Sequence, residues 1–322
     1  MGAAVARSKK NGACMMHLDK RTVWGIAYVI MAAASFATLD TATKFVSGEV
    51  TFAVVMWFRF GFQILTTGVW LKQQQGSIAL TSNAKGLQIY RGILLTLSSA
   101  LAFFSLKLIP VADFTSIMML TPLLMTVVAA IAMAEKVSPL RWFFVLLGFV
   151  GALVVIRPGH DEFTWGSLLP LLLVVTSTGF QLLTYRLAKL DDAVTTHWYT
   201  GWIGFVLATC ALPFVIQSSG QAWVDAAMSG WNVIGWLVLI AVFATLGHGL
   251  LILGYARAPV AVLTPYLYAQ IPFAVFGGWL VFAHKLDSWA ALGIGIIAAS
   301  GVLGTWVAAR ERHTDLRVIL DN

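Results

Sequence analysis

Residues 106–136 read LKLIPVADFTSIMMLTPLLMTVVAAIAMAEK, and residues 255–285 read YARAPVAVLTPYLYAQIPFAVFGGWLVFAHK. The two stretches match at a separation of about 149 positions. A Pro-Val-Ala run begins at Pro110 in the first and at Pro259 in the second, and each stretch closes on a Glu-Lys or His-Lys pair. Both carry a central proline inside a long apolar run. The chain therefore contains an internal duplication of an apolar, helix-forming unit.

The composition is that of an integral membrane protein. Of 322 residues, 59% are hydrophobic and 11% are charged, and the mean hydropathy is +0.83. Soluble domains are about half apolar and about a quarter charged. The net charge of +7 does not indicate nucleic-acid binding, because the basic residues stand at the ends of apolar runs, as membrane topology requires. The two cysteines, Cys14 and Cys210, are not expected to form a disulfide.

A helix needs about 20 apolar residues to cross the hydrocarbon core of a bilayer. The sequence predicts ten such spans, at residues 23–45, 52–72, 86–106, 110–134, 140–156, 165–187, 195–216, 231–255, 259–283 and 287–308. We therefore expect an all-α membrane protein. The duplication divides it into four parts: a cytoplasmic N-terminal segment, two five-helix repeats and a cytoplasmic C-terminal tail, at residues 1–22, 23–158, 159–309 and 310–322.

An odd number of spans in each repeat places the second repeat upside down in the membrane. Inverted repeats are the architecture of many secondary carriers, whose substrate site lies near the midplane beside broken helices. Pro122 and Pro272 fall inside the fourth and ninth spans, where the missing backbone donor favours a break. The alternative is that these prolines only kink their helices.

Orientation follows from the distribution of Lys and Arg. With the N-terminus in the cytoplasm, sixteen of these residues fall at cytoplasmic span ends and three, Lys107, Arg157 and Lys285, fall at outer ends. Because positive charge accumulates on the cytoplasmic side, we expect both termini in the cytoplasm and the protein in the inner (plasma) membrane.

Four segments carry a family resemblance: YRGILL at residues 90–95, ALAFFSLKLIPVADFTSIMMLTPLL at 100–124, AEKVSP at 134–139 and GFVGALVVIRPG at 148–159. In these the chain resembles the EamA-type transporters of the drug/metabolite transporter superfamily. The resemblance implies ten helices, a central cavity between two five-helix halves, and alternating access without ATP. The segments LDTATKF at 39–45 and WFRF at 57–60 look like a branch that includes riboflavin importers, S-adenosylmethionine carriers and metallophore exporters.

Three charges fall within the spans. Asp40 and Lys44 are four residues apart on the first span, so they share a helix face and are expected to pair. Arg59 lies at a similar depth on the second span. Charges inside a membrane segment usually face the interior and mark a pathway. The cluster is expected to be a substrate site, a gate or a structural lock between the two helices.

Uncharged residues near the midplane complete the expected substrate site. Tyr266 and Gln270 form an i, i+4 pair on the ninth span, and His248 is deep in the eighth. Gln181 and Trp57 are further candidates for the cavity wall. Lys44 and Arg59 against Asp40 would leave a net positive corner, which favours a carboxylate-bearing or aromatic metabolite, such as an amino-acid derivative or a flavin.

The sequence therefore predicts a secondary transporter of a small organic metabolite. A membrane scaffold or sensor without transport is the alternative. No group of residues has the spacing of a metal site or of a nucleophile with its base, so we expect neither an enzyme nor a bound cofactor. The expected partners are a small-molecule substrate and the lipid bilayer. A coupling ion and a homodimer are left open.

Overall fold

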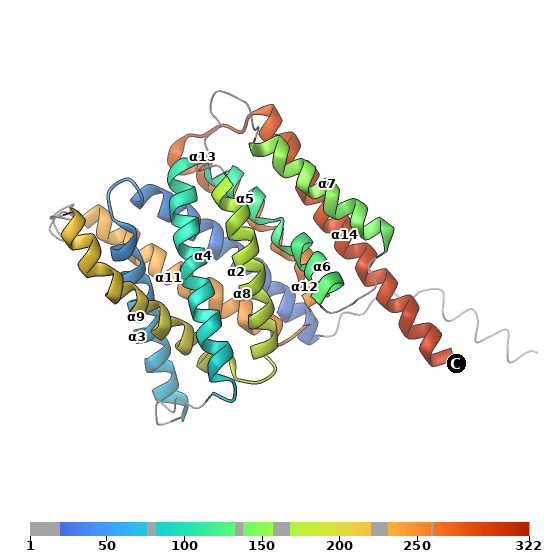
Figure 1. The fold of residues 1–322 in the computed structure, drawn as a ribbon, viewed down its shortest axis with the longest axis horizontal. Helices are drawn as coiled ribbons and strands as arrows, with labels where there is room; N and C mark the ends of the chain where they lie inside the picture. The colour runs from blue at the N-terminus through green and yellow to red at the C-terminus, as the bar shows by residue number, and fades with distance from the viewer. Residues whose placement is uncertain are drawn as a thin grey trace, which may run out of the picture.

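The computed structural model of the chain describes residues 20–75, 82–132, 138–156, 168–219, 231–258 and 260–321. The regular elements of these ranges are α-helices: α2 (Lys20–Val46), α3 (Phe52–Gln75), α4 (Lys85–Leu108), α5 (Val111–Met118), α6 (Thr121–Ala132), α7 (Pro139–Ile156), α8 (Leu169–Leu187), α9 (Ala193–Ser219), α11 (Trp231–Tyr255), α12 (Val260–Leu267), α13 (Gln270–Phe282) and α14 (Ser288–Asp321). They pack side by side, with α7 and α14 together along one flank (Figure 1). The all-α prediction is confirmed.

The helices of the described residues make ten membrane-spanning units, because α5 with α6, and α12 with α13, are each one span interrupted near its middle. Six of the helices are long and apolar enough to cross a membrane by length and composition. The ten-span prediction is therefore confirmed, including the breaks in the fourth and ninth spans.

Each break comes just before a proline. The first lies at Met119 and Leu120, and Pro122 follows in the first turn of α6, where a missing backbone donor costs little. The second break precedes Gln270, with Pro272 in the first turn of α13. Side chains bond to the backbone freed at the first break: the Thr121 hydroxyl donates to the carbonyl oxygen of Met118 at 2.7 Å. Broken helices are tolerated at membrane depth only where such groups are satisfied.

The two halves repeat one another in space. The equivalent helices α5 and α12, α6 and α13, and α7 and α14 each begin 149 positions apart, the separation found in the sequence. Helix α2 of the first half packs on α11 of the second. The counterpart of α2 is α8, which packs on α4, the counterpart of α11. Likewise α13 packs on α2 and α6 on α8, while α3 packs on its own counterpart α9. Exchanging the halves preserves these pairings, as a two-fold pseudo-symmetry requires.

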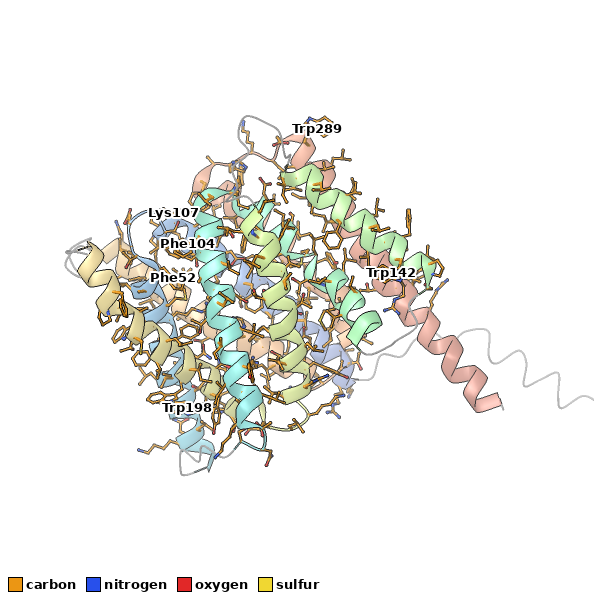
Figure 2. All side chains as sticks on the ribbon, in the orientation of Figure 1. Phe52, Phe104, Lys107, Trp142, Trp198 and Trp289 are labelled. Carbon is orange, nitrogen blue, oxygen red and sulfur yellow. The ribbon has the colours of Figure 1, made fainter. Side chains whose placement is uncertain are left out.

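Aromatic residues stand at the helix ends, as expected of interfacial anchors. Trp24, Trp70 and Trp142 are exposed near the ends of α2, α3 and α7. Trp289 is also exposed, in the first turn of α14, and Figure 2 shows Trp142 and Trp289 at opposite ends of this flank. Between such ends, large apolar side chains such as Phe214 face outward, where a soluble protein would be polar.

Some predicted boundaries lie outside the described residues. These are the junction of the two repeats near residue 158 and most of the N-terminal segment 1–22. The helix α14 continues through the predicted tail as far as Asp321.

Candidate functional site

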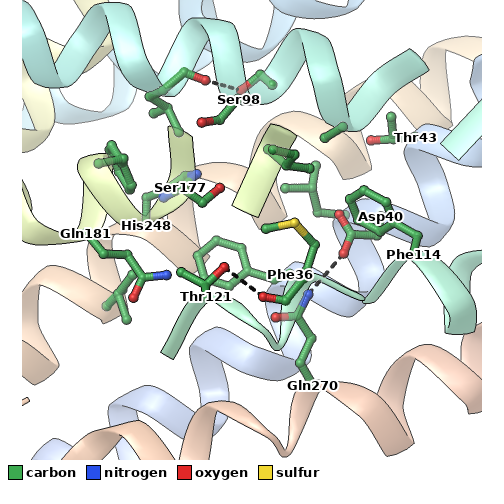
Figure 3. A pocket seen from close by; sticks show the side chains of 18 of the residues that line it. Phe36, Asp40, Thr43, Ser98, Phe114, Thr121, Ser177, Gln181, His248 and Gln270 are labelled. Atoms are coloured by element: carbon green, nitrogen blue, oxygen red, sulfur yellow. Dashed lines mark hydrogen bonds between the residues drawn. The ribbon is translucent and has the colours of Figure 1, made fainter. Parts of the chain in front are cut away.

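A cavity lies between the two halves, and both halves line it (Figure 3). Its unfilled space is about 990 Å³, including the part open to solvent. The polar lining comes from seven helices and is formed by Asp40, Thr43, Arg59, Ser98, Ser99, Thr121, Ser177, Gln181, His248 and Gln270. Phe36, Phe114 and Phe180 supply aromatic wall. Both helix breaks reach the cavity.

Asp40 joins the first half to the second. One of its carboxylate oxygens accepts a hydrogen bond of 3.0 Å from the amide nitrogen of Gln270, the first residue of α13. Both side chains are buried. Gln270 therefore makes this bond directly after the break. The carboxylate keeps acceptor capacity that this single bond does not use.

Arg59 makes the second link between the halves. Its guanidinium donates to the Ser99 hydroxyl at 2.6 Å and lies 2.9 Å from Nε2 of His248. Arg59 is only 4% exposed. Ser99 and His248 are themselves 149 positions apart, on the equivalent helices α4 and α11. The arginine therefore bridges two positions that the pseudo-symmetry relates.

The same symmetry relates the two ends of the cavity. Asp40 and Gln181 each lie six positions before the end of their helix, α2 or α8. Gln270 and Thr121 are the first residues of α13 and α6. In Figure 3, Gln181 lies beside Thr121 at one side of the cavity, and Asp40 lies beside Gln270 at the other. The duplication thus builds two related polar corners, of which only one carries a charge.

Residues 23–157 match the profile of the EamA-like transporter family. The resemblance to EamA-type drug/metabolite transporters that the sequence carries is confirmed.

Several known proteins are similar to this chain over both of its halves. A protein of Rhizobium johnstonii named riboflavin transporter is 24% identical over 88% of this chain and 91% of its own length. A riboflavin transporter of Vibrio cholerae is 25% identical over 92% of this chain and 98% of its own. The pseudopaline exporter of Pseudomonas aeruginosa is 21% identical over 82% and 89%.

One solved crystal structure has the same fold as this chain. It superposes with a TM-score of 0.62 at 16% identity, and the match covers 90% of this chain and 98% of the other. At this identity the match concerns the fold alone.

Five of the eight residues predicted for the substrate site line the cavity: Asp40, Arg59, Gln181, His248 and Gln270. Lys44, Trp57 and Tyr266 are not among its lining residues. Trp57 instead packs in the α3–α9 interface, 5.3 Å from the Phe205 ring centre.

The predicted pairing of Lys44 with Asp40 is wrong. No hydrogen bond or ion pair joins the two within the part of the chain that the structure describes. The ammonium group of Lys44 donates instead to the carbonyl oxygens of Leu106 and Ile109, each at 2.8 Å. Helix ends carry carbonyls without intrahelical partners, and a cation near a helix C-terminus satisfies them. The C-terminal end of α4 therefore takes Lys44 away from the cavity.

The predicted pair of Tyr266 and Gln270 is also wrong. The i, i+4 argument assumed one continuous helix, but the break at residues 268 and 269 places Tyr266 in α12 and Gln270 in α13. Tyr266 is half-buried and packs with Leu251, Tyr255 and their neighbours. Only Gln270 reaches the cavity.

The sequence interpretation missed the aromatic walls and the depth of one arginine. Phe36 precedes Asp40 by one helical turn, and that spacing could have indicated a shared face. Arg91, in the second turn of α4, is 1% exposed. It donates to the hydroxyls of Thr184 and Thr200, and its guanidinium lies 4.6 Å from the ring centre of Phe180. Within the described residues, no group of His, Cys, Asp or Glu has the arrangement of a metal site.

Proposed function

We propose that the protein is a secondary transporter that carries a small, planar, overall neutral metabolite, with a flavin as the leading candidate. The observation that carries the proposal is the cavity at the interface of two inverted repeats, beside two broken helices. That arrangement is where secondary carriers bind their substrates. Asp40, Arg59, Gln181, His248 and Gln270 are proposed to contact the substrate.

The charges of the cavity support a neutral substrate over an anion. With Lys44 outside, the described lining carries one acidic residue, Asp40, and one arginine, Arg59. The sequence predicted a net positive charge because it placed Lys44 and Arg59 together against Asp40. Without Lys44, the charges of Arg59 and Asp40 balance. A ligand with no net charge avoids leaving an unbalanced charge in a medium of low dielectric constant.

The walls support a flat aromatic body. Phe36, Phe114 and Phe180 line the cavity together with Met118 and Met119. Aromatic rings stack on or meet other rings edge to face, and methionine adapts to aromatic surfaces. Riboflavin joins such a body to an uncharged hydroxylated chain. The similarity to proteins named riboflavin transporters supports the same choice.

The membrane setting is part of the proposal. We place both termini in the cytoplasm and the protein in the plasma membrane, with repeats at residues 23–158 and 159–309. The two halves would expose the cavity to each side in turn. A coupling ion, if one takes part, would meet Asp40, the carboxylate of the described cavity lining.

Uptake into proteoliposomes tests the function. Vesicles that contain the purified protein should accumulate more labelled riboflavin than protein-free vesicles. A zwitterionic amino-acid derivative should compete poorly with this uptake. Asp40→Asn should reduce uptake, while Thr209→Val, on the exposed face of α9, should not. If the vesicles take up neither compound, the result favours the scaffold alternative. Strong transport of the zwitterion alone would replace the flavin.

A further inference from the structure

The hydrogen bonds of His248 determine where its ring proton lies. A guanidinium only donates hydrogen bonds, and Arg59 lies 2.9 Å from Nε2 of His248. Nε2 must therefore be the acceptor, which makes the ring neutral with its proton on Nδ1. Nδ1 is buried and has no hydrogen-bond partner within the described residues. His248 lines the cavity, and the described part of the protein leaves its Nδ1 donor unsatisfied.

Tyr255 orients the second donor. Its hydroxyl donates to the amide oxygen of Gln181 at 3.1 Å. Tyr255 is 6% exposed, and a buried phenol needs an acceptor for its hydrogen. The amide of Gln181 must therefore turn its oxygen to Tyr255 and its nitrogen the other way. Figure 3 shows that nitrogen pointing towards Thr121 and the cavity.

The opposite corner has the reverse polarity. The carboxylate of Asp40 can only accept, so Gln270 presents its nitrogen to it at 3.0 Å. The amide oxygen of Gln270 then points away from Asp40, as Figure 3 shows. Asp40 and Gln270 therefore offer acceptors, whereas His248 and Gln181 offer donors.

We infer that the cavity is polarised, with a donor corner at Gln181 and His248 and an acceptor corner at Asp40 and Gln270, and that it orients a ligand whose acceptors and donors lie at opposite ends. This inference rests on the proposed flavin substrate, and it assigns each end of the flavin to one corner of the cavity. The ring carbonyls accept from Gln181 and His248. The hydroxyls of the ribityl chain donate to Asp40 and Gln270.

Two ligands allow the contributions of the two corners to be measured independently. Riboflavin carries both ends, whereas lumiflavin has a methyl group in place of the ribityl chain. Binding of each to the full-length protein in nanodiscs is measured by quenching of flavin fluorescence. The variant His248→Gln keeps an acceptor for Arg59 at the Nε2 position and lacks the Nδ1 donor. Asp40→Asn keeps the shape of the other corner and removes its charge, and Thr209→Val is the control.

His248→Gln should weaken the binding of both flavins by roughly tenfold, as expected for one lost hydrogen bond. Asp40→Asn should weaken the binding of riboflavin by a similar factor and change the affinity for lumiflavin by less than about twofold, because only riboflavin carries the hydroxyl donors. Equal losses for both ligands in both variants would overturn the assignment of the ends. So would a loss confined to lumiflavin in Asp40→Asn.

A measurement without ligand keeps the inference separate from the flavin proposal. In protein labelled with ¹⁵N-histidine, the resonances lost in His248→Gln belong to His248. They should have the shifts of a neutral ring protonated at Nδ1. A ring protonated at Nε2, or a cationic ring, would overturn the donor corner whatever the substrate. The neutral Nδ1 form in a protein that binds neither flavin would support the polarity and refute the flavin substrate.

Discussion

The hydroxyl of Tyr268 donates a hydrogen bond of 3.1 Å to the carbonyl oxygen of Met119, and the two residues lie 149 positions apart. Each stands in the break of its own repeat. The breaks therefore touch one another, and a side chain of the second repeat satisfies backbone that the first leaves unpaired.

Tyr268→Phe should lower the free energy of unfolding by about 1–3 kcal/mol, because it leaves a buried carbonyl without its donor. Tyr266→Phe is the matched control two residues away, since its half-buried hydroxyl makes no hydrogen bond within the described residues. Denaturation of both variants in detergent checks this. Equal effects of the two would contradict a specific role for the bond.

Gly301 on α14 makes room for the same tyrosine. A Cβ at Gly301 would overlap the hydroxyl and ring of Tyr268, whereas a Cβ at Gly295 on the same helix would meet nothing. Gly301→Ala should therefore cost about 1–3 kcal/mol of stability through overpacking, and Gly295→Ala should be nearly neutral. Thermal unfolding of the two variants measures the difference. A stable Gly301→Ala protein would show that α14 can shift away from the break.

Asp40 should couple energetically to Gln270 more strongly than to Lys44. In double-mutant cycles with Asp40→Asn, the partner change Gln270→Leu should give an interaction energy of roughly 0.5–3 kcal/mol. Lys44→Met should give a smaller one, because Lys44 bonds to Leu106 and Ile109 instead. The cycles are measured by denaturation. A larger coupling to Lys44 would restore the ion pair expected from the helix spacing.

Asp191 should make stability depend on pH in the acid range. It lies between α8 and α9 and accepts hydrogen bonds from Ser82, Asn83 and Gln88. Burial acts to raise the pKa of Asp191, but these hydrogen bonds outweigh it, so its pKa lies below the ordinary value. A depressed pKa stabilises the folded state above the unfolded pKa, about 3.9, and that stabilisation is lost as the pH falls through the folded pKa.

The difference in melting temperature between the native protein and Asp191→Ala should therefore be constant above about pH 5 and shrink below about pH 4. Thermal unfolding across this range measures it. A difference that grows on acidification would have the wrong sign for this carboxylate.

Both termini should lie in the cytoplasm. The asymmetry of sixteen basic residues against three is the reason. A C-terminal reporter that fluoresces only in the cytoplasm should be active, and an alkaline phosphatase fusion at the same place should be inactive. The reverse result would contradict the proposed orientation.

Sequence patterns alone predicted the ten spans, the duplication and the breaks near Pro122 and Pro272. These features depend on span length, repetition and the chemistry of proline, all of which can be read from the order of the residues. The same patterns predicted that Asp40, Arg59, His248 and Gln270 lie deep in the membrane, because a residue's distance from the end of its span determines its depth.

Only the tertiary structure decided which of these side chains meet. Depth along the membrane normal does not say which neighbouring helix a residue faces. Lys44 shares a helix face with Asp40, yet the free carbonyls at the end of α4 lie within its reach and bind it. Tyr266 and Gln270 share a span, yet the break places them in different helices, α12 and α13. The contacts of Asp40 with α13 and of Arg59 with α11 depend on how two inverted halves pack, and that packing is set by residues far apart in the chain.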